Sequence, residues 1–416
     1  MIFTNRVNQL MNIKLPIVVV TYNRSNSLQR LLHSIENAYF PSDILIDLII
    51  SIDYTGGNDC SNIANNFIWT HGEKRVIKHT DNLGLRNHIL SCGNIALEND
   101  GVIILEDDCF VANDFYNYAL QAYIFYNNDP IIAGISLYSY QFNDNVKMPF
   151  ETLKDGNDIF FMQVPSSSGQ LWTKNQWKQF AEYFKSNPII SDRDKIPEYV
   201  KTWPESSWKK YFYKYMVEKD LYFVYPQISF STNFGEIGAN STGINYRHQV
   251  SINSCFNINY KFVAFNDSNN IYDAYFEILP CCLNNLRFDY EYSFNVDTYL
   301  SKQSFAIDAE FIITTYAGLK SEKQFGISLK PLINNLLYNI QGDGLYIVQV
   351  SEYNKKTKQN NLNSIYKNQN AVPYQMGYEN GYDKGEENIR NTITFRLGRK
   401  LISILDVRNW FKYTTK

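Results

Sequence analysis

Runs of apolar residues alternate with amphipathic segments along the first third of the chain. Residues 15–21 (LPIVVVT) and 101–105 (GVIIL) are apolar at almost every position, which is typical of strands buried on both faces of a sheet. Between such runs, residues 25–35 place leucine and isoleucine at helical spacing after a serine that can cap the helix. The alternation predicts an α/β fold with a mostly parallel, Rossmann-like sheet covered by helices on both faces.

The same pattern continues up to residue 137 and then becomes less regular. Further strands are predicted at 47–53, 75–79, 131–137, 160–164, 221–225, 260–264 and 346–350. Further helices are predicted up to residue 67 and at 85–97, 113–125, 175–184 and 205–216. Residues 251–353 are expected to form a C-terminal subdomain, and the Asn-rich stretch 354–387 is expected to be a polar linker.

Charge and composition narrow the functional classes. The chain has 416 residues and a net charge of −3, so no basic excess suggests a nucleic-acid partner. No apolar run approaches the roughly 18 residues that a membrane-spanning helix needs, and the N-terminal residues lack the apolar core of a signal peptide. The six cysteines form no CxxC pair, which indicates neither a zinc site nor a disulfide framework. These features predict a cytoplasmic protein.

Polar side chains follow three of the first four predicted strands. Thr21 and Arg24 follow the first, Asp53 ends the second, and residues 106–108 (EDD) follow the fourth. Ligands of open parallel sheets bind beyond the carboxyl ends of the strands, so these groups are expected to converge there. Adjacent carboxylates raise one another's pKa unless a cation lies between them. A divalent cation with hard oxygen ligands, Mn²⁺ or Mg²⁺, is the expected partner, although a solvated acidic loop or helix caps would also explain the acidic run.

Absent motifs restrict the ligand further. The chain has no GxxxxGK[ST] phosphate loop, and no GxGxxG follows the first strand. P-loop nucleotide hydrolysis and ordinary dinucleotide binding are therefore disfavoured. A nucleoside diphosphate held through a metal ion fits the remaining residues.

Several segments resemble a GT-A glycosyltransferase of the family-two-like kind. The residues that carry the resemblance are VVVTYNRSNSLQRLLHSI from residue 18, SID at 51–53, NLGLRNHIL at 82–90 and VIILEDDCFVANDFYNY at 102–118. The last segment is also similar to the metal-binding region of the eukaryotic N-acetylglucosaminyltransferase that begins complex N-glycans. SGQLW at 168–172 resembles an acceptor-side glycine loop, WPESSW at 203–208 a catalytic helix region, and PQISFSTNFG at 226–235 the segment after it. The resemblance implies a GT-A catalytic domain over 14–250.

The resemblance also implies roles for individual residues. Thr21 and Arg24 would line the nucleotide site, Asp53 would hydrogen-bond the base or ribose, and Arg86 would face the nucleotide or its diphosphate. Within the acidic motif, Glu106 and Asp107 would contact the donor sugar and ribose, and Asp108 would be the direct metal ligand. Arg24 and Arg86 could instead be surface helix residues, and Asp53 could simply cap the following turn. His248 could reach the metal or the diphosphate, or be structural.

The catalytic base is the point at which the sequence departs from the family. Inverting relatives use a carboxylate on the catalytic helix to take the proton of the acceptor hydroxyl. Lys209 and Lys210 stand where that acid is expected, and a lysine base would have to be strongly desolvated. Glu205, about one helical turn earlier, and Glu236 are the two alternatives.

The C-terminal segment 388–416 differs from the rest of the chain. Seven Lys and Arg stand against one Asp, and Leu, Ile and Trp recur beside them at near-helical spacing. A basic amphipathic helix of this kind can lie in an anionic membrane interface, or it can dock on the protein's own core. Both interpretations stay open.

Together these features predict a glycosyltransferase that moves a hexosyl or N-acetylhexosaminyl unit with inversion. The expected partners are a nucleotide-sugar donor, with a UDP-sugar favoured, and a glycan or lipid-linked glycan acceptor of bacterial surface polysaccharide. The enzyme would be cytoplasmic, with segment 388–416 offering contact with the inner face of the membrane. The alternatives are a catalytically degenerate relative that only binds a nucleotide or glycan, and a sugar nucleotidyltransferase, although residues 21–26 (TYNRSN) lack the glycine-rich loop expected of the latter.

Overall fold

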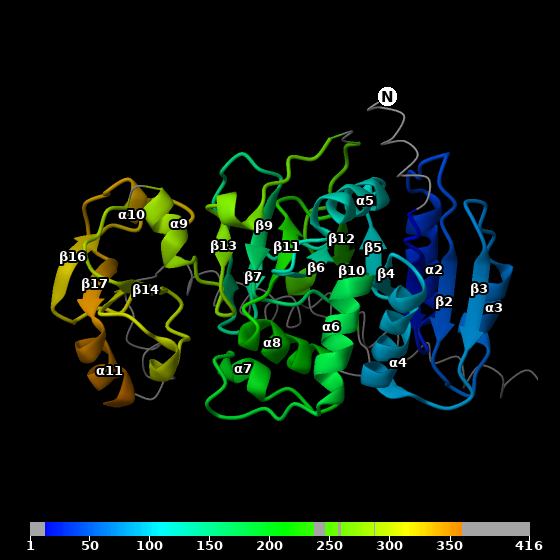
Figure 1. The fold of residues 1–416 in the computed structure, drawn as a ribbon, viewed down its shortest axis with the longest axis horizontal. Coiled ribbons are helices and arrows are strands. Elements are labelled where there is room, and N and C mark those ends of the chain that lie inside the picture. Colours follow the sequence, from blue (N-terminus) through cyan, green and yellow to red (C-terminus); the bar gives the residue numbers. More distant parts are fainter. Residues whose placement is uncertain (1–12, 237–245, 257–258, 287, 360–416) are drawn as a thin grey trace, which may run out of the picture.

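A mixed nine-stranded sheet forms the centre of the computed structural model, which describes residues 13–236, 246–256, 259–286 and 288–359 (Figure 1). From one edge to the other its strands are β13 (Ile271–Tyr272), β9 (Ile159–Met162), β11 (Tyr222–Pro226), β6 (Ile132–Ser136), β10 (Gln170–Thr173), β4 (Gly101–Glu106), β1 (Ile17–Thr21), β2 (Leu48–Ile52) and β3 (Lys74–Lys78). Most neighbours run parallel, and the antiparallel pairs are β9–β11, β6–β10 and β10–β4. The predicted α/β class with a mostly parallel sheet is confirmed.

Strands β4, β1 and β2 lie side by side in the sheet, and each is apolar on both faces. Every residue of β1 and β2 is buried, and β4 is buried up to Leu105 before Glu106 becomes partly exposed. Such strands require helices on their faces, and the intervening segments supply them. These helices are α2 (Ser25–Glu36), α3 (Asp59–Asn66), α4 (Gly84–Gly93) and the 3₁₀ turn η1 (Asn94–Glu98).

The second half of the large sheet is built from less regular segments. Its other elements are β5 (Cys109–Val111), α5 (Phe115–Tyr126), β7 (Phe142–Asn143), β8 (Met148–Pro149), α6 (Lys174–Lys185), α7 (Glu198–Lys201), α8 (Trp208–Glu218), β12 (Ser231–Asn233) and η2 (Tyr246–His248). Helix α6 begins with a capping box, in which the Thr173 hydroxyl accepts from the Gln176 N–H and the Gln176 side chain accepts from the Thr173 N–H. Helices α4, α6 and α8 contact one another beside this part of the sheet.

Aromatic residues fill the space between these helices and the sheet. Trp172 on β10 stacks on Phe212 of α8 with ring centroids 5.6 Å apart, and it also contacts the ring of Trp177 on α6. All of the largest fully buried side chains are aromatic. Much of the aromatic content of the sequence is therefore explained by the core rather than by ligand binding.

The large sheet extends beyond the predicted boundary at residue 250. Strand β13 pairs with β9 and forms the edge of the sheet. The strand predicted at 260–264 is wrong, because this segment follows an irregular path. There Tyr260 and Phe262 pack against the ring of Tyr118 on α5, and the Tyr260 hydroxyl donates to Asp114. Packing on α5 takes the place of strand pairing.

A second, four-stranded sheet lies beyond β13 in the chain and in space (Figure 1). Its order is β14 (Phe294–Asp297), β15 (Phe311–Thr314), β17 (Leu345–Gln349) and β16 (Ser321–Phe325). The surrounding elements are η3 (Phe265–Asp267), α9 (Pro280–Asn285), η4 (Ser304–Ala306), α10 (Asn334–Leu337) and α11 (Val350–Gln359). Helix α11 continues past residue 354, where the polar linker was expected to begin. The remainder of that linker and the basic segment 388–416 lie outside the described residues.

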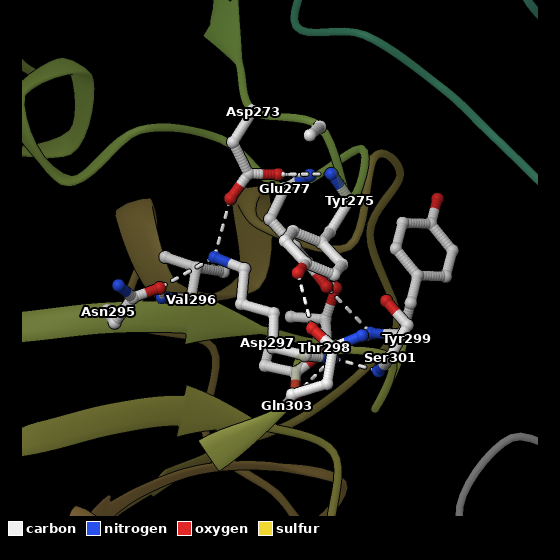
Figure 2. Close-up of polar contacts among 12 residues, drawn as sticks. Asp273, Tyr275, Glu277, Asn295, Val296, Asp297, Thr298, Tyr299, Ser301 and Gln303 are labelled. Atoms are coloured by element: carbon white, nitrogen blue, oxygen red, sulfur yellow. Dashed lines mark hydrogen bonds and ion pairs between the residues drawn. The ribbon is translucent and has the colours of Figure 1, made fainter. Parts of the chain in front are cut away.

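Buried polar groups join the segment after β13 to the second sheet (Figure 2). The Glu277 carboxylate accepts hydrogen bonds from the Tyr299 N–H at 2.7 Å and from the Thr298 hydroxyl at 2.8 Å. At the end of β14, Asp297 accepts from the Ser301 N–H at 2.9 Å and from the Tyr353 hydroxyl of α11 at 2.9 Å. Glu277 thus ties the loop after β14 to the segment after β13, and Asp297 ties α11 to the end of β14.

Within the described part of the chain, no helix is both long enough and apolar enough to cross a membrane. All six cysteines are unpaired.

Candidate functional site

The polar strand ends meet along one edge of the large sheet, which we call the carboxyl edge: the ends of β1, β2 and β4 with the residues that follow them. Strand β1 lies between β2 and β4 and is parallel to both. The Asp53 N–H donates to the Thr21 carbonyl at 3.0 Å, and the Asp107 N–H donates to the Val20 carbonyl at 3.0 Å. The residues after the three strands are therefore held side by side by backbone pairing, as the sequence predicted.

Arg24 and Thr21 hold the acidic motif from the β1 side. The Thr21 hydroxyl donates to Asp107 at 2.7 Å, and the Arg24 guanidinium pairs with both Asp107 and Asp108, the latter at 2.9 Å. Arg24 is three-quarters buried, and its neighbouring carboxylates keep its pKa above the ordinary value despite burial. Arg24 is therefore not an exposed surface residue, which was the alternative left by the sequence.

Asp53 is a buried carboxylate that anchors the start of α4. It accepts hydrogen bonds from the N–H groups of Tyr54 at 2.9 Å, Leu83 at 2.8 Å and Gly84 at 3.0 Å. Both oxygens are thus engaged by backbone donors, which is the capping role that the sequence left open. Oδ1 accepts two of these bonds and Oδ2 only one, so Oδ2 can still accept a hydrogen bond from a donor group on a ligand.

Glu106 carries the strongest electrostatic perturbation of the acidic motif. Burial, followed by the charges of Asp108 and Asp107, raises the pKa of Glu106 to about 8. Burial likewise raises the pKa of Asp107, although Arg24 and Thr21 oppose that effect. Arg24 thus pairs with the carboxylates of both Asp107 and Asp108, and the acidic groups of residues 106–108 outnumber this one guanidinium.

This donor set fits a hard divalent cation in chemistry and charge. Asp108 is partly exposed and presents oxygen ligands; Asn233 of β12 donates to one of its oxygens at 3.0 Å, and Arg24 donates to the other. Within the described residues, no three His, Cys, Asp or Glu side chains form a ready-made metal cluster. Mn²⁺ and Mg²⁺ commonly take one or two carboxylates and complete their shell with water and substrate phosphates, so a single direct ligand is compatible with either ion.

The two carboxylates predicted as catalytic bases both lie in ion pairs. Glu205, whose side chain is 71% exposed, pairs with Lys210 at 2.7 Å and accepts from the Tyr211 hydroxyl. These hydrogen bonds lower the pKa of Glu205. The Glu205 carbonyl in turn accepts from Arg86 at 2.5 Å, so Arg86 links α4 to the segment before α8.

Glu236 is held more tightly. Both of its oxygens accept from Arg30 of α2, at 2.7 and 2.8 Å, and the Ser27 hydroxyl donates to it as well. The Arg30 hydrogen bonds lower the pKa of Glu236 to about 2. A carboxylate in this state is a weak base.

Lys209 occupies a different environment from Lys210. Its ammonium donates to the Tyr140 hydroxyl at 2.9 Å and to Ser167 Oγ at 3.2 Å. Burial lowers the pKa of Lys209 to about 8, against the opposing charges of Asp144 and Glu106. The fold thus partly buries the Lys209 ammonium, which nothing in the sequence indicated.

His248 lies near this lysine and pairs with a carboxylate that the sequence analysis did not single out. His248 Nε2 is 3.7 Å from Asp144 Oδ1. Burial lowers the pKa of His248, and the charges of Lys209, Lys147 and Arg247 lower it further. Asp144, Tyr140 and Ser167 were missed because they lie in irregular segments, where no periodicity shows which side chains converge.

The comparisons with known proteins agree with the sequence resemblance. Residues 17–194 match the sequence profile of the family described as Glycosyl transferase family 2. The matched residues include β1, β2, β4 and the acidic motif, which are the segments that carry the resemblance in the sequence. A search of curated protein sequences finds no match.

Some solved structures show a weak likeness to this chain. A mannosyltransferase from Pyrobaculum calidifontis in complex with GDP-Man and Mn²⁺ has 13% identity and a TM-score of 0.30, covering 44% of this chain and 53% of its own. Residues 1–349 of TarS from S. aureus in complex with UDP-GlcNAc have 14% identity and a TM-score of 0.34, covering 54% and 60%. The match to the longer TarS structure covers 53% of this chain and 36% of TarS, with a TM-score of 0.33. This chain therefore spans between about a third and three-fifths of the length of these proteins.

Proposed function

We propose that this chain, whose residues 17–194 match the profile of Glycosyl transferase family 2, transfers a sugar from a nucleoside-diphosphate sugar to a glycan acceptor. The observation that supports this most strongly is the convergence of Thr21, Arg24, Asp53 and residues 106–108 at the carboxyl edge. The site combines the buried carboxylate of Asp53, the charged Arg24 and the acidic groups of residues 106–108. Such a site suits a ligand that brings together a hydrogen-bond donor, phosphates and a metal cation.

The residues divide between the parts of the donor. Thr21 and Arg24 would line the nucleotide site, and Asp53 would accept from the nucleobase or ribose. Glu106 and Asp107 would contact the ribose and donor sugar, and Arg86 would face the nucleotide or its diphosphate. Asp108 would hold Mn²⁺ or Mg²⁺, which when bound supplies Lewis-acid stabilisation of the departing diphosphate. Arg24 already orients Asp108, so the acid is positioned before the donor binds.

The transfer would invert the configuration of the sugar. An acceptor hydroxyl attacks the anomeric carbon from the face opposite the diphosphate, the bond to the diphosphate oxygen breaks, and the hydroxyl proton passes to a base. Glu205 and Glu236 stay the predicted bases, and each would first have to leave its ion pair. His248 stays a predicted ligand of the metal or diphosphate, with Asp144 as its present partner.

The finer identity of the reaction is part of the proposal. A UDP-sugar with a hexosyl or N-acetylhexosaminyl unit is the favoured donor; the remaining acceptor position of Asp53 would take the N–H of its uracil ring, and a panel of nucleotide sugars separates uracil from the other bases. A lipid-linked glycan of bacterial surface polysaccharide is the favoured acceptor, because the basic segment 388–416 would bring the chain to an anionic membrane. The competing proposal is a relative that binds donor or glycan without turnover, and the ion-paired states of Glu205 and Glu236 are the observations that favour it.

The first experiment is a thermal-shift panel of UDP-, GDP-, CMP- and dTDP-sugars, each with Mn²⁺, with Mg²⁺ and with chelator. A ligand at about 100 times its dissociation constant adds roughly 2.7 kcal/mol to the free energy of unfolding, which is enough to raise the melting temperature measurably. We expect one nucleotide class to stabilise the wild type only when metal is present. Asp108→Asn keeps the shape of the side chain but loses its charge, so it should abolish that shift.

Asp43→Asn is the matched control, because Asp43 is an exposed acid in the loop before β2. It should shift as the wild type does. The donor site at residues 106–108 would be ruled out by a wild type that shifts with none of the nucleotides, or by an Asp108→Asn variant that shifts normally. Metal-dependent binding with no transfer to any acceptor would favour the binding protein over the enzyme.

A further inference from the structure

Lys209 lies in a group of polar side chains on the far side of the acidic motif from the predicted nucleotide site. We call this group the β6-side cluster: Tyr140, Asp144, Lys147, Ser167, Lys209, Arg247 and His248. Tyr140 follows β6, Ser167 precedes β10, and Lys209 lies in the first turn of α8. In the sheet, β10 and β6 continue beyond β4 on the side away from β1.

The Lys209 ammonium is held by neutral groups. Its hydrogen-bond acceptors are the Tyr140 hydroxyl at 2.9 Å and Ser167 Oγ at 3.2 Å, and no carboxylate of the described residues forms an ion pair with it. The Trp203 and Tyr140 rings lie 5.9 and 5.7 Å from the nitrogen. A partly buried ammonium that has a third donor and forms no ion pair with a described carboxylate favours an anionic ligand, which can accept a charge-assisted hydrogen bond.

The surrounding charges favour an anion over a cation. Lys209, Lys147 and Arg247 all act electrostatically on His248, against the single carboxylate of Asp144. That carboxylate is already shared, since Lys147 lies 3.8 Å and His248 3.7 Å from the same oxygen. The other groups that face Lys209 are Glu106 at the end of β4 and Tyr199 of α7.

Resting on the proposed function, we infer that Lys209 is a specificity-determining residue that binds a carboxylate or phosphate carried by the acceptor glycan. The donor's own diphosphate is the other source of such an anion. The sheet order favours the acceptor, because Arg24 and Asp108 receive the donor over β1 and β4, whereas Lys209 lies over β10 and β6. An acidic sugar seated there would place its neighbouring hydroxyl groups next to the donor sugar.

The test measures binding to the full chain loaded with Mn²⁺ and the nucleoside diphosphate that the thermal-shift panel identifies. The probes are matched pairs, glucose against glucose 6-phosphate and galactose against galacturonate, titrated by calorimetry. We expect the anionic member of at least one pair to bind about tenfold or more tightly than its neutral partner, as a charge-assisted hydrogen bond allows. Lys209→Gln should remove this preference, and Lys209→Arg should retain most of it.

Two further variants keep the result interpretable. Lys178→Gln removes an exposed lysine of α6 and should leave the preference unchanged, whereas Tyr140→Phe removes one hydroxyl that positions Lys209 and should weaken it severalfold. The inference is overturned if neutral and anionic probes bind equally, if Lys209→Gln keeps the preference, or if the anionic probe competes with the nucleoside diphosphate, which would assign Lys209 to the donor.

The two proposals fail in different ways. Nucleotide binding without any preference for anionic sugars sinks the acceptor inference and leaves the glycosyltransferase proposal intact. A preference for anionic sugars in a protein that binds no nucleotide with either metal supports the anion site and sinks the transferase proposal. Lys209→Gln should keep the metal-dependent nucleotide shift of the wild type.

Discussion

A carboxylate can act as a general base only when its proton affinity and its surroundings let it receive a proton. Glu236 is paired with Arg30 through both oxygens, and its pKa falls to about 2. Glu205 is exposed to solvent and paired with Lys210, which also lowers its pKa. In both cases, protonation during the reaction would have to break favourable interactions with a cation.

Replacing each glutamate separately distinguishes a catalytic role from a structural one. Because loss of a general base usually costs about 10²–10⁴-fold in rate, we expect the Gln variant of the glutamate that serves as the base to lose that much kcat, and the Gln variant of the other glutamate to lose less than about tenfold. Glu236→Gln should also lower the melting temperature, since Arg30 loses its partner, whereas Glu205→Gln should change it little. Steady-state transfer rates between pH 5 and 9 check this; a drop of more than a hundredfold in either variant would identify that residue as the base.

The site residues that the sequence predicted correctly in position share one property. Thr21, Asp53 and the acidic motif each follow an apolar strand, so parallel pairing alone brings them together. In the sequence, Lys209 stands out only because it is a lysine at a position where an acidic residue is expected. Its burial depends on Tyr140 and Ser167, which are distant in sequence and follow no periodic pattern.

At the scale of elements, the predictable strands are those that are apolar on both faces. Strands β1, β2, β4, β6 and β17 show this pattern in sequence and in burial. Strand β16 (SEKQF) is mostly exposed and polar, so nothing local distinguishes it from a loop; it exists because β17 offers an edge for pairing. The antiparallel position of β10 between β4 and β6 could not be predicted either, because the direction of a strand does not affect its amino-acid composition.

Close packing of β6 against β11 gives a prediction for the large sheet. Gly134 of β6 pairs with Phe223, and a Cβ added at Gly134 would lie 2.3 Å from the Phe223 ring. Gly134→Ala should therefore cost about 1–3 kcal/mol of unfolding free energy, as overpacked cores do, and lower the melting temperature by several degrees. In Gly57→Ala the nearest atom would be 3.4 Å away on an exposed turn, so no change is expected. Equal melting temperatures for the two variants would contradict the packing argument.

At the scale of the whole molecule, two sheets are joined through buried charge (Figure 2). Lys302 forms an ion pair with Asp273 at 2.5 Å and donates to Asn295 at 2.6 Å, next to the carboxylates of Glu277 and Asp297. Burial raises the pKa of Glu277 to about 8, with the Asp297 charge adding to it, and burial also raises the pKa of Asp297. Ionisation of Glu277 or Asp297 is therefore expected to weaken the connection between the two sheets.

The raised pKa makes this connection sensitive to pH in a defined direction. Because the folded state holds the Glu277 proton more tightly than the unfolded state, the contribution to stability is complete below the unfolded value near 4.5. It is lost progressively as the pH rises towards about 8. Each unit of raised pKa corresponds to about 1.4 kcal/mol, and the nearby Lys302 offsets part of this.

Glu277→Gln removes the titrating proton while keeping a side-chain oxygen that can accept from the Tyr299 N–H. The fall in melting temperature of the full chain between pH 5 and pH 9 should therefore be shallower in the variant than in the wild type. At pH 9 the variant should be more stable by on the order of 2 kcal/mol. Glu322→Gln, an exposed acid on β16, should keep the wild-type slope. If Glu277→Gln also keeps that slope, Glu277 is ionised in the folded state at neutral pH, and its hydrogen bonds to Tyr299 and Thr298, together with the charge of Lys302, compensate for its burial.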